Sequence, residues 1–246
     1  MITTISGIPG SGKNVLATHI ALKHYKKENN IIRRFIRKLR HEPVWVNNVY
    51  TSYPILLKKK SLFSKNKLPV YSNHVTLFDL VPTYRYLPNA LIIIDEVQVI
   101  FDSEEYKQFP KEIATFNQFH RHFDISDIYY ITQHPSRLMK KLRILSNEFD
   151  KVKTFLHLPL FPFGLMHIVK YFEFDDYGKY HHPKKEAKTY DVKNQYKFFN
   201  CSKVFKRYTS KYMKILNIDS PLYNKGTYNN KILNDNEIKY IFRDKI

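Results

Sequence analysis

Apolar runs and helically spaced apolar positions alternate along the first part of the chain. Ile2–Ser6 is a short apolar segment, and Lys13–Lys26 places apolar side chains at helical spacing. Leu91–Ile94 is an unbroken apolar run, typical of a strand that is covered on both faces of a parallel sheet. Asp127–Gln133 indicates a second central strand. Strands that alternate with helices predict βαβ units with right-handed crossovers, and therefore an α/β fold.

The pattern changes after about residue 150, where paired strands and a basic helix follow. We therefore expect an α/β core over residues 1–150, a small β/α C-terminal extension over 151–216 that completes the domain, and a polar, flexible tail over 217–246. The other expected elements are strands at Pro43–Tyr50, Lys151–Leu158 and Leu165–Phe174, helices at Phe109–His122, Ser136–Arg143 and Ser202–Met213, and a basic, exposed helix or loop at Arg33–His41.

One segment resembles a membrane span in composition. Thr154–Val169 carries no Lys, Arg, Asp or Glu, but Pro159, Pro162 and Gly164 interrupt it. It is shorter than the roughly 20 apolar residues that a spanning helix needs. A buried strand, a turn and a second strand are expected instead, and no transmembrane helix is predicted.

Composition narrows the function classes. Apolar residues make up 43% of the 246-residue chain and charged residues 26%, a balance typical of globular proteins. The single cysteine, Cys201, excludes an internal disulfide and fits a reducing cytoplasm. The formal net charge is +19, with basic residues concentrated at Lys23–Arg40, at Lys58–Lys60 and in the last third. Such stripes attract nucleic acid or anionic lipid, although A/T-rich codons alone would also enrich the chain in lysine.

A glycine-rich stretch follows the first predicted strand and precedes the first predicted helix. Gly7, Gly12 and Lys13 match the phosphate-binding pattern G-x-x-x-x-G-K. Backbone N–H groups of such a loop and the positive end of the following helix bind phosphate, and the lysine neutralises β- and γ-phosphate oxygens. The chain is therefore predicted to bind ATP. The predicted nucleotide-binding residues are Gly7, Ile8, Pro9, Gly10, Ser11, Gly12, Lys13 and Asn14.

The residue after the lysine departs from the usual pattern. Asn14 stands where a Ser or Thr normally gives a hydroxyl oxygen to Mg²⁺. An amide oxygen can coordinate the metal directly or through water, and the alternative is that Asn14 only caps the turn. We expect weakened Mg²⁺ affinity with nucleotide binding retained.

Two carboxylates follow the most apolar strand. Asp95 and Glu96 come directly after Leu91–Ile94, at the carboxyl end where open α/β sheets bind ligands. Asp95 is expected to hold Mg²⁺ through water, and Glu96 to polarise the attacking water as general base. The competing interpretation is a helix N-cap and first turn. Gln133, which ends the next central strand, is predicted to sense the γ-phosphate and orient water.

Hydrolysis in such ATPases is often completed by an arginine from a neighbouring subunit. Arg121 and Arg143 are the preferred candidates, ahead of Arg137, although each of these residues also fits an ordinary surface position. The predicted catalytic set is therefore Glu96, Gln133, Arg121 and Arg143, and the predicted metal ligands are Asn14 and Asp95.

Several motifs together resemble the zonular occludens toxin family, the assembly and export ATPases of filamentous phages. The specific ones are the R-H…D-I-x-x-I-T-Q-x-P stretch from Arg121 to Pro135 and K-V-F-x-x-Y-x-S from Lys203 to Ser210. The resemblance covers roughly residues 1–213. It implies a P-loop NTPase fold of the FtsK–HerA motor group, with a central, mostly parallel sheet flanked by helices.

The resemblance also implies a function and partners. It predicts ATP hydrolysis coupled to extrusion of single-stranded phage DNA at the host inner membrane, by a homo-oligomeric ring that contacts coat or export proteins. The family's usual transmembrane helix is not found in this sequence, so the expected membrane attachment is either peripheral, at the cytoplasmic face, or supplied by a partner. Two alternatives stay open: a genome-packaging ATPase of an icosahedral virus acting on double-stranded DNA, and a non-hydrolysing nucleotide-binding scaffold.

Overall fold

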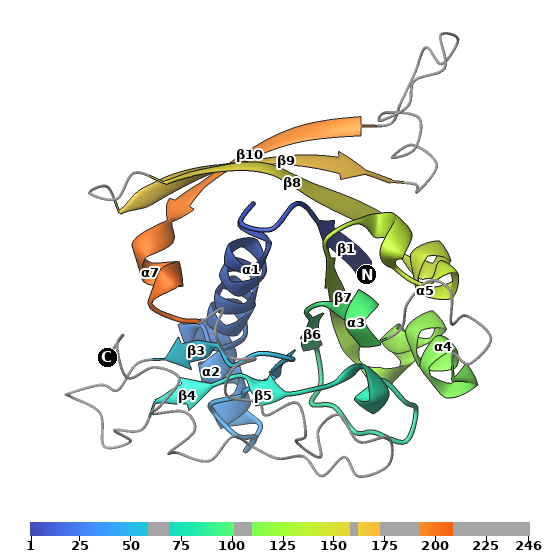
Figure 1. Cartoon of the computed structure of the whole chain (residues 1–246). Helices are drawn as coiled ribbons and strands as arrows, with labels where there is room; N and C mark the ends of the chain where they lie inside the picture. The colour runs from blue at the N-terminus through green and yellow to red at the C-terminus, as the bar shows by residue number, and fades with distance from the viewer. Residues whose placement is uncertain (59–68, 101–109, 158–161, 173–191, 209–246) are drawn as a thin grey trace, which may run out of the picture.

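The computed structural model describes residues 1–58, 69–100, 110–157, 162–172 and 192–208 (Figure 1). The strands of the main sheet are β1 (Ile2–Ser6), β2 (Val49–Thr51), β5 (Asn73–His74), β6 (Ala90–Ile94), β7 (Ile125–Thr132), β8 (Glu148–His157), β9 (Phe163–Tyr171) and β10 (Val192–Asn200), and a small sheet holds β3 (Leu56–Lys58) and β4 (Val70–Tyr71). The α-helices are α1 (Lys13–Glu28), α2 (Ile31–Leu39), α3 (Val97–Ile100), α4 (Lys111–Gln118), α5 (Lys140–Leu145) and α7 (Cys201–Phe205), with 3₁₀ turns η1 (Leu77–Asp79), η3 (His120–Phe123) and η4 (Pro135–Arg137).

The main sheet has eight strands in the order β10-β9-β8-β1-β7-β6-β2-β5. The six strands from β8 to β5 run parallel to one another. β9 and β10 add to one side as antiparallel strands, and they arch with β8 over one end of α1 (Figure 1). The predicted α/β fold with a mostly parallel sheet is confirmed.

Each face of the sheet has its own core because successive strand side chains point to opposite faces. On one face, Leu91 and Ile93 of β6 pack in a cluster with α1. On the other face, Ile92 and Ile94 pack in a cluster with α3, α4 and α5. Burial on both sides explains why the sequence of β6 shows no polar alternation.

β8 joins the two predicted regions of the chain. It runs across residue 150 and pairs in parallel with β1 over Glu148–Lys151, so the antiparallel strands continue the same sheet. The two strands expected around Thr154–Val169 are present as β8 and β9, although they are only partly buried, with Leu156 and Leu165 exposed. Residues 158–161 and the predicted tail 217–246 lie outside the described residues.

The strand predicted at Pro43–Tyr50 is wrong in its extent, since β2 begins only at Val49. Side chains take the place of strand partners in the preceding residues. The Asn29 amide donates to the Val46 carbonyl oxygen at 2.8 Å and its oxygen accepts from the Val46 N–H at 2.9 Å. A backbone that is paired in this way has fewer groups left for a sheet ladder.

Three predicted helices are shorter in the structure. The helix expected at Phe109–His122 is α4, which ends at Gln118 and is followed by η3. The segment Ser136–Arg143 divides into η4 and α5, and the His134 imidazole accepts from the Ser136 N–H at the start of η4. The helix expected from Ser202 is α7, which ends at Phe205, and residues from 209 onward lie outside the described range. β10 was not expected, because its sequence mixes lysine, amide and aromatic residues without a clear alternation.

Among the described residues, no helix combines the length and the apolar character that crossing a membrane requires.

Candidate nucleotide-binding site

The glycine-rich loop lies at the carboxyl edge of the parallel strands. It connects the end of β1 to the start of α1, and the Gly7 N–H donates to the Gln133 carbonyl oxygen, just after β7, at 3.3 Å. Ser11 and Lys13 are buried, whereas Ile8, Pro9 and Gly10 are exposed at the tip of the loop. The loop is therefore anchored at both ends and open at its tip, where a phosphate would enter.

Glycine is required at two positions because the wall formed by β8 and β9 lies against the loop. A Cβ atom on Gly7 would lie 2.7 Å from the Val152 carbonyl oxygen. Gly12 has φ +94°, and a Cβ atom there would lie 3.1 Å from Phe155 and from Met166. The strands added to the parallel sheet thus form one side of the candidate site.

The Lys13 ammonium lies inside the loop. It donates to the carbonyl oxygens of Gly7 at 2.7 Å and Ile8 at 3.1 Å. Burial lowers the pKa of Lys13, and the charges of Glu96 and Asp95 oppose this shift. A partly desolvated ammonium held by neutral carbonyl groups is well placed to exchange them for phosphate oxygens.

Asn14 contacts Asp95 directly. Its side-chain N–H donates to Asp95 Oδ2 at 2.7 Å, which joins the first turn of α1 to the end of β6. The other carboxylate oxygen of Asp95 accepts from the Glu96 N–H at 2.9 Å. Asn14 therefore orients the carboxylate, and no side-chain hydrogen bond caps the start of α1, whose N-cap residue is Gly12.

Asp95 is only 7% exposed, and no cation forms an ion pair with it among the described residues. Burial raises its pKa to about 6, while the hydrogen bond from Asn14 acts in the opposite direction. A buried carboxylate whose donors are neutral is costly in its charged form, and a bound cation would relieve that cost.

Glu96 has a left-handed backbone, with φ +52°. Its carboxylate accepts a hydrogen bond from the Gln98 side chain in α3. A glutamate is rare in this backbone region, and such residues occur most often at functional sites. The structure brings Glu96 next to Asp95 at the end of β6, close enough to Lys13 for its charge to affect the lysine pKa.

Gln133 and the candidate arginines lie at different distances from the loop. Gln133 is adjacent to it through its backbone, and its side-chain oxygen lies 3.5 Å from Arg137 Nη1. Arg143 Nη1 donates to the Ser136 carbonyl oxygen at 3.3 Å. Arg121 is exposed in η3, before β7 begins, and therefore at the opposite edge of the sheet. Arg121 therefore lies away from the glycine-rich loop of its own chain.

Three further residues approach the site without a sequence motif to mark them. The Asp95 N–H donates to Ser52 Oγ at 2.8 Å, and the Tyr53 hydroxyl lies 3.5 Å from the Asn14 carbonyl oxygen. Burial and then the charge of Asp95 raise the pKa of Tyr208 to about 12. Ser52 and Tyr53 follow β2, the neighbour of β6, so the rule that parallel strands end at one edge is the signal that could have found them.

The donor set fits Mg²⁺ bound together with a nucleotide. Mg²⁺ needs oxygen ligands and usually takes one or two carboxylates plus phosphates and water. Asp95 supplies the carboxylate, Asn14 has an amide oxygen, and the buried Ser11 hydroxyl has no hydrogen-bond partner among the described residues. No group of three or more His, Cys, Asp or Glu side chains in the described part of the chain forms a metal cage. The phosphates of the nucleotide would therefore have to provide the other negatively charged oxygen ligands of Mg²⁺.

A mostly parallel sheet with a glycine-rich loop between its first strand and first helix defines the P-loop NTPase class of folds. The family model for zonular occludens toxin (Zot) matches residues 1–213. The chain therefore belongs to the Zot family.

One solved structure of the same family agrees with this fold, and a second match is reported beside it. The N-terminal domain of zonular occludens toxin from Neisseria meningitidis is 18% identical, with a TM-score of 0.51, and the match covers 85% of this chain and 98% of that one. The genome packaging NTPase B204 from Sulfolobus turreted icosahedral virus 2, in complex with ATP-gammaS, is 15% identical with a TM-score of 0.36. This match covers 64% of this chain and 76% of that one. A search of curated proteins found no match.

Proposed function

We propose that this chain is an ATPase motor of phage morphogenesis, which hydrolyses ATP to ADP and phosphate and uses the energy to move viral single-stranded DNA during extrusion and assembly. The contact between Asn14 and Asp95 carries the proposal, because it joins the phosphate-binding loop to the carboxylate strand in one site. Membership of the Zot family supports the same role.

In this proposal each residue of the site has a separate role in phosphate binding, metal binding or hydrolysis. The backbone of Gly7–Lys13 and the Lys13 ammonium bind the β- and γ-phosphates. Asp95, oriented by Asn14, would hold Mg²⁺, which neutralises developing charge on the phosphates when bound. Glu96 orients and deprotonates the attacking water, and Gln133 senses the γ-phosphate from the end of β7.

A homo-oligomeric ring is part of the proposal. Arg121 lies at the edge of the sheet opposite to the loop, so it can complete hydrolysis only in a neighbouring subunit. Arg143, which contacts the carbonyl oxygen of Ser136 in η4, is the second candidate for that role. DNA, together with coat or export proteins, would be the partners of the ring.

A second candidate function is a nucleotide-binding assembly scaffold that does not hydrolyse ATP. One observation favours it: Asn14 replaces the usual hydroxyl residue and donates an N–H to Asp95, the same carboxylate that would hold the metal. Measured hydrolysis separates the two functions.

The test measures ATP hydrolysis by the wild type and by Glu96→Gln, alone, with single-stranded DNA and with double-stranded DNA. We expect a loss of about 100-fold or more in Glu96→Gln, as for removal of a general base, with ATP binding retained. Glu112→Gln, an exposed glutamate in α4, is the matched control and should stay near the wild-type rate.

If the wild type hydrolyses ATP no faster than Glu96→Gln under every condition, the motor proposal is wrong and the scaffold is favoured. Stronger stimulation by double-stranded than by single-stranded DNA would instead favour a genome-packaging role.

A further inference from the structure

Helix α2 exposes an entire apolar face. Its nine residues, IIRRFIRKL, combine apolar side chains on one side with basic side chains on the other, and none is buried. At 100° per residue the apolar positions span roughly 140° of the helix circumference. The exposed fractions are 77% for Ile31, 69% for Ile32, 61% for Phe35, 41% for Ile36 and 65% for Leu39.

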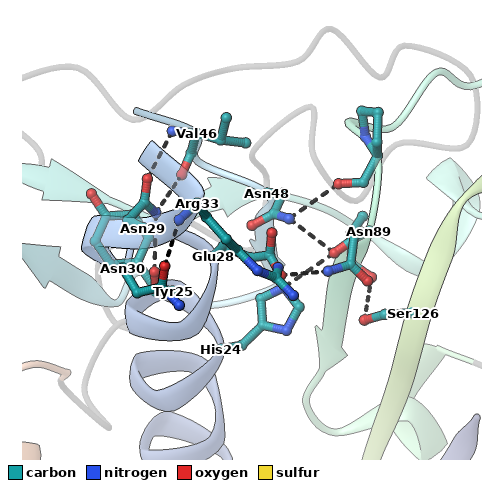
Figure 2. A network of polar contacts seen from close by, with 12 residues as sticks. His24, Tyr25, Glu28, Asn29, Asn30, Arg33, Val46, Asn48, Asn89 and Ser126 are labelled. Atoms are coloured by element: carbon teal, nitrogen blue, oxygen red, sulfur yellow. Dashed lines mark hydrogen bonds and ion pairs between the residues drawn. The ribbon is translucent and has the colours of Figure 1, made fainter. Parts of the chain in front are cut away.

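The rotation of α2 is set by a buried carboxylate at the end of α1. Glu28, 2% exposed, forms ion pairs with Arg33 and with Arg37, and the Arg37 Nη2 to Glu28 Oε2 distance is 3.1 Å. Arg37 Nη1 also donates to the Glu28 carbonyl oxygen at 2.8 Å. The Asn89 side chain donates to Glu28 from the other side (Figure 2).

The start of α2 is fixed as well. Asn30 caps the helix by accepting from the Arg33 N–H at 2.7 Å, and Asn29 ties the end of α1 to Val46 (Figure 2). Because two of its arginines turn inward to Glu28, the opposite side of the helix must face outward. Specific contacts therefore fix the orientation in which the apolar face of α2 is exposed to solvent.

We propose that α2 docks this chain on a membrane surface that contains anionic lipids. The inference deepens the proposed function and rests on it, since it assigns to one helix of the motor the peripheral membrane attachment that the family resemblance led us to expect. Five large apolar side chains on a short basic helix are typical of interfacial helices that lie in the headgroup region. Lys38 and Arg40 are exposed and available to lipid phosphates.

A tryptophan contacts α2 through Arg34, on the basic side of the helix. Trp45 is 46% exposed, with the Arg34 guanidinium 4.5 Å and the Lys58 ammonium 3.8 Å from its ring centroid. Tryptophan is enriched at the depth of lipid headgroups, where its ring is apolar and its N–H stays hydrated. Together with the two cations it extends the basic, amphipathic surface beyond α2.

Charge and chemistry favour lipid over other occupants. Nucleic acid would need the basic side of α2, but Arg33 and Arg37 are paired with Glu28. The outward side is mostly aliphatic and offers few rings for base stacking. A second copy, with net charge +19, would bring its own basic helix to the contact. A bilayer with anionic headgroups supplies both acyl chains and phosphates.

The position of α2 leaves the nucleotide site free. α1 has 16 residues and separates α2 from the glycine-rich loop by roughly 24 Å along its axis. One nine-residue helix binds weakly, but several copies in a ring would bind together and raise the overall affinity.

The experiment measures flotation of the full chain with vesicles of phosphatidylcholine containing about one third phosphatidylglycerol, and with pure phosphatidylcholine vesicles. The test variant is Ile32→Glu with Phe35→Glu, and the matched control is Ile144→Glu with Leu87→Glu, two exposed apolar residues elsewhere. We expect anionic vesicles to bind the wild type and the control, and the partition coefficient of the test variant to fall at least about tenfold.

Equal binding of the test variant and the wild type to anionic vesicles would overturn the proposal. Absence of wild-type binding to these vesicles would overturn it as well. In that second case, self-association of the wild type and of the test variant is also measured. Loss of self-association in the test variant would make α2 an interface between copies. ATP hydrolysis without vesicles is measured in parallel and should be the same in the test variant as in the wild type. This measurement distinguishes failure of the motor proposal from failure of the membrane proposal. If the chain is not a motor, the wild type does not hydrolyse ATP but still binds anionic vesicles.

Discussion

A buried carboxylate lies near each end of α1, and the two are balanced in different ways. At the C-terminal end, Glu28 is paired with the arginines of α2 and accepts a hydrogen bond from Asn89. At the N-terminal end, the donors that the described residues offer to the Asp95 carboxylate are neutral N–H groups, those of Asn14 and the Glu96 backbone. A carboxylate that is fully paired with cations holds structure, whereas one with neutral partners retains its capacity for a cationic ligand.

The largest effect is expected at the phosphate end of α1. Lys13→Ala removes the one buried ammonium of the loop, and we expect ATP hydrolysis to fall roughly 1,000-fold, the upper range for loss of one transition-state donor. Steady-state phosphate release measures it, and Lys111→Ala, at the exposed start of α4, is the control. Hydrolysis that survives in Lys13→Ala would show that the glycine-rich loop is not the catalytic site.

Removing the carboxylate at the other end should damage stability instead. Glu28→Ala leaves two arginines without their partner, and we expect the free energy of unfolding to fall by about 3 kcal/mol. Urea unfolding measures this loss, with Glu112→Ala as the surface control. A change as small as that of the control would mean that the Glu28 network contributes little to holding α2.

Asp95→Asn should separate stability from function. Burial raises the Asp95 pKa to about 6 from its ordinary value of 3.8, so between these pH values the folded state binds more protons than the unfolded state and stability falls as pH rises. Above pH 6 the ionised carboxylate costs stability, and we expect Asp95→Asn to gain roughly 1–3 kcal/mol at pH 8.

That gain should shrink toward pH 4, where the wild-type carboxylate is already protonated in the folded protein. Urea unfolding at both pH values measures it, and ATP hydrolysis should be lost in the same variant. An identical difference in stability at pH 4 and pH 8 would contradict a raised Asp95 pKa.

The smallest effect is expected at the residue that departs from the usual pattern. Asn14→Ser restores a hydroxyl, which can both contact Asp95 and coordinate Mg²⁺, so Mg²⁺-ATP affinity should be preserved or rise by about threefold, within 1 kcal/mol. Titration with a fluorescent ATP analogue with and without Mg²⁺ measures it. Loss of binding would mean that the amide of Asn14 has a role that a hydroxyl cannot fill.

Local patterns predicted the centre of the candidate site well, because the relevant spacing is short. Gly7, Gly12 and Lys13 occupy one turn between a strand and a helix, and Asp95 follows an apolar run that is typical of a buried strand. The structure places them at one edge of the sheet, as parallel strands require. Their roles in nucleotide and metal binding stay predictions.

Other features could not be predicted in this way. The strand β10 pairs with β9 through backbone hydrogen bonds, which its mixed sequence does not indicate. The start of β2 depends on Asn29, a residue far from it in sequence, whose side chain pairs with the backbone of Val46. Such contacts arise only when the chain has folded.

The sequence by itself determined the α/β class, the phosphate-binding loop and the basic character of residues 33–41, since each depends on neighbours a few positions apart. Tertiary structure decided which way these features face. It placed Asn14 against Asp95, Arg121 at the edge opposite to the loop, and the apolar side of α2 toward solvent. The physical reason is the same in each case: burial and charge pairing between distant segments, as with Glu28 and Arg37, select one orientation from several that local sequence allows.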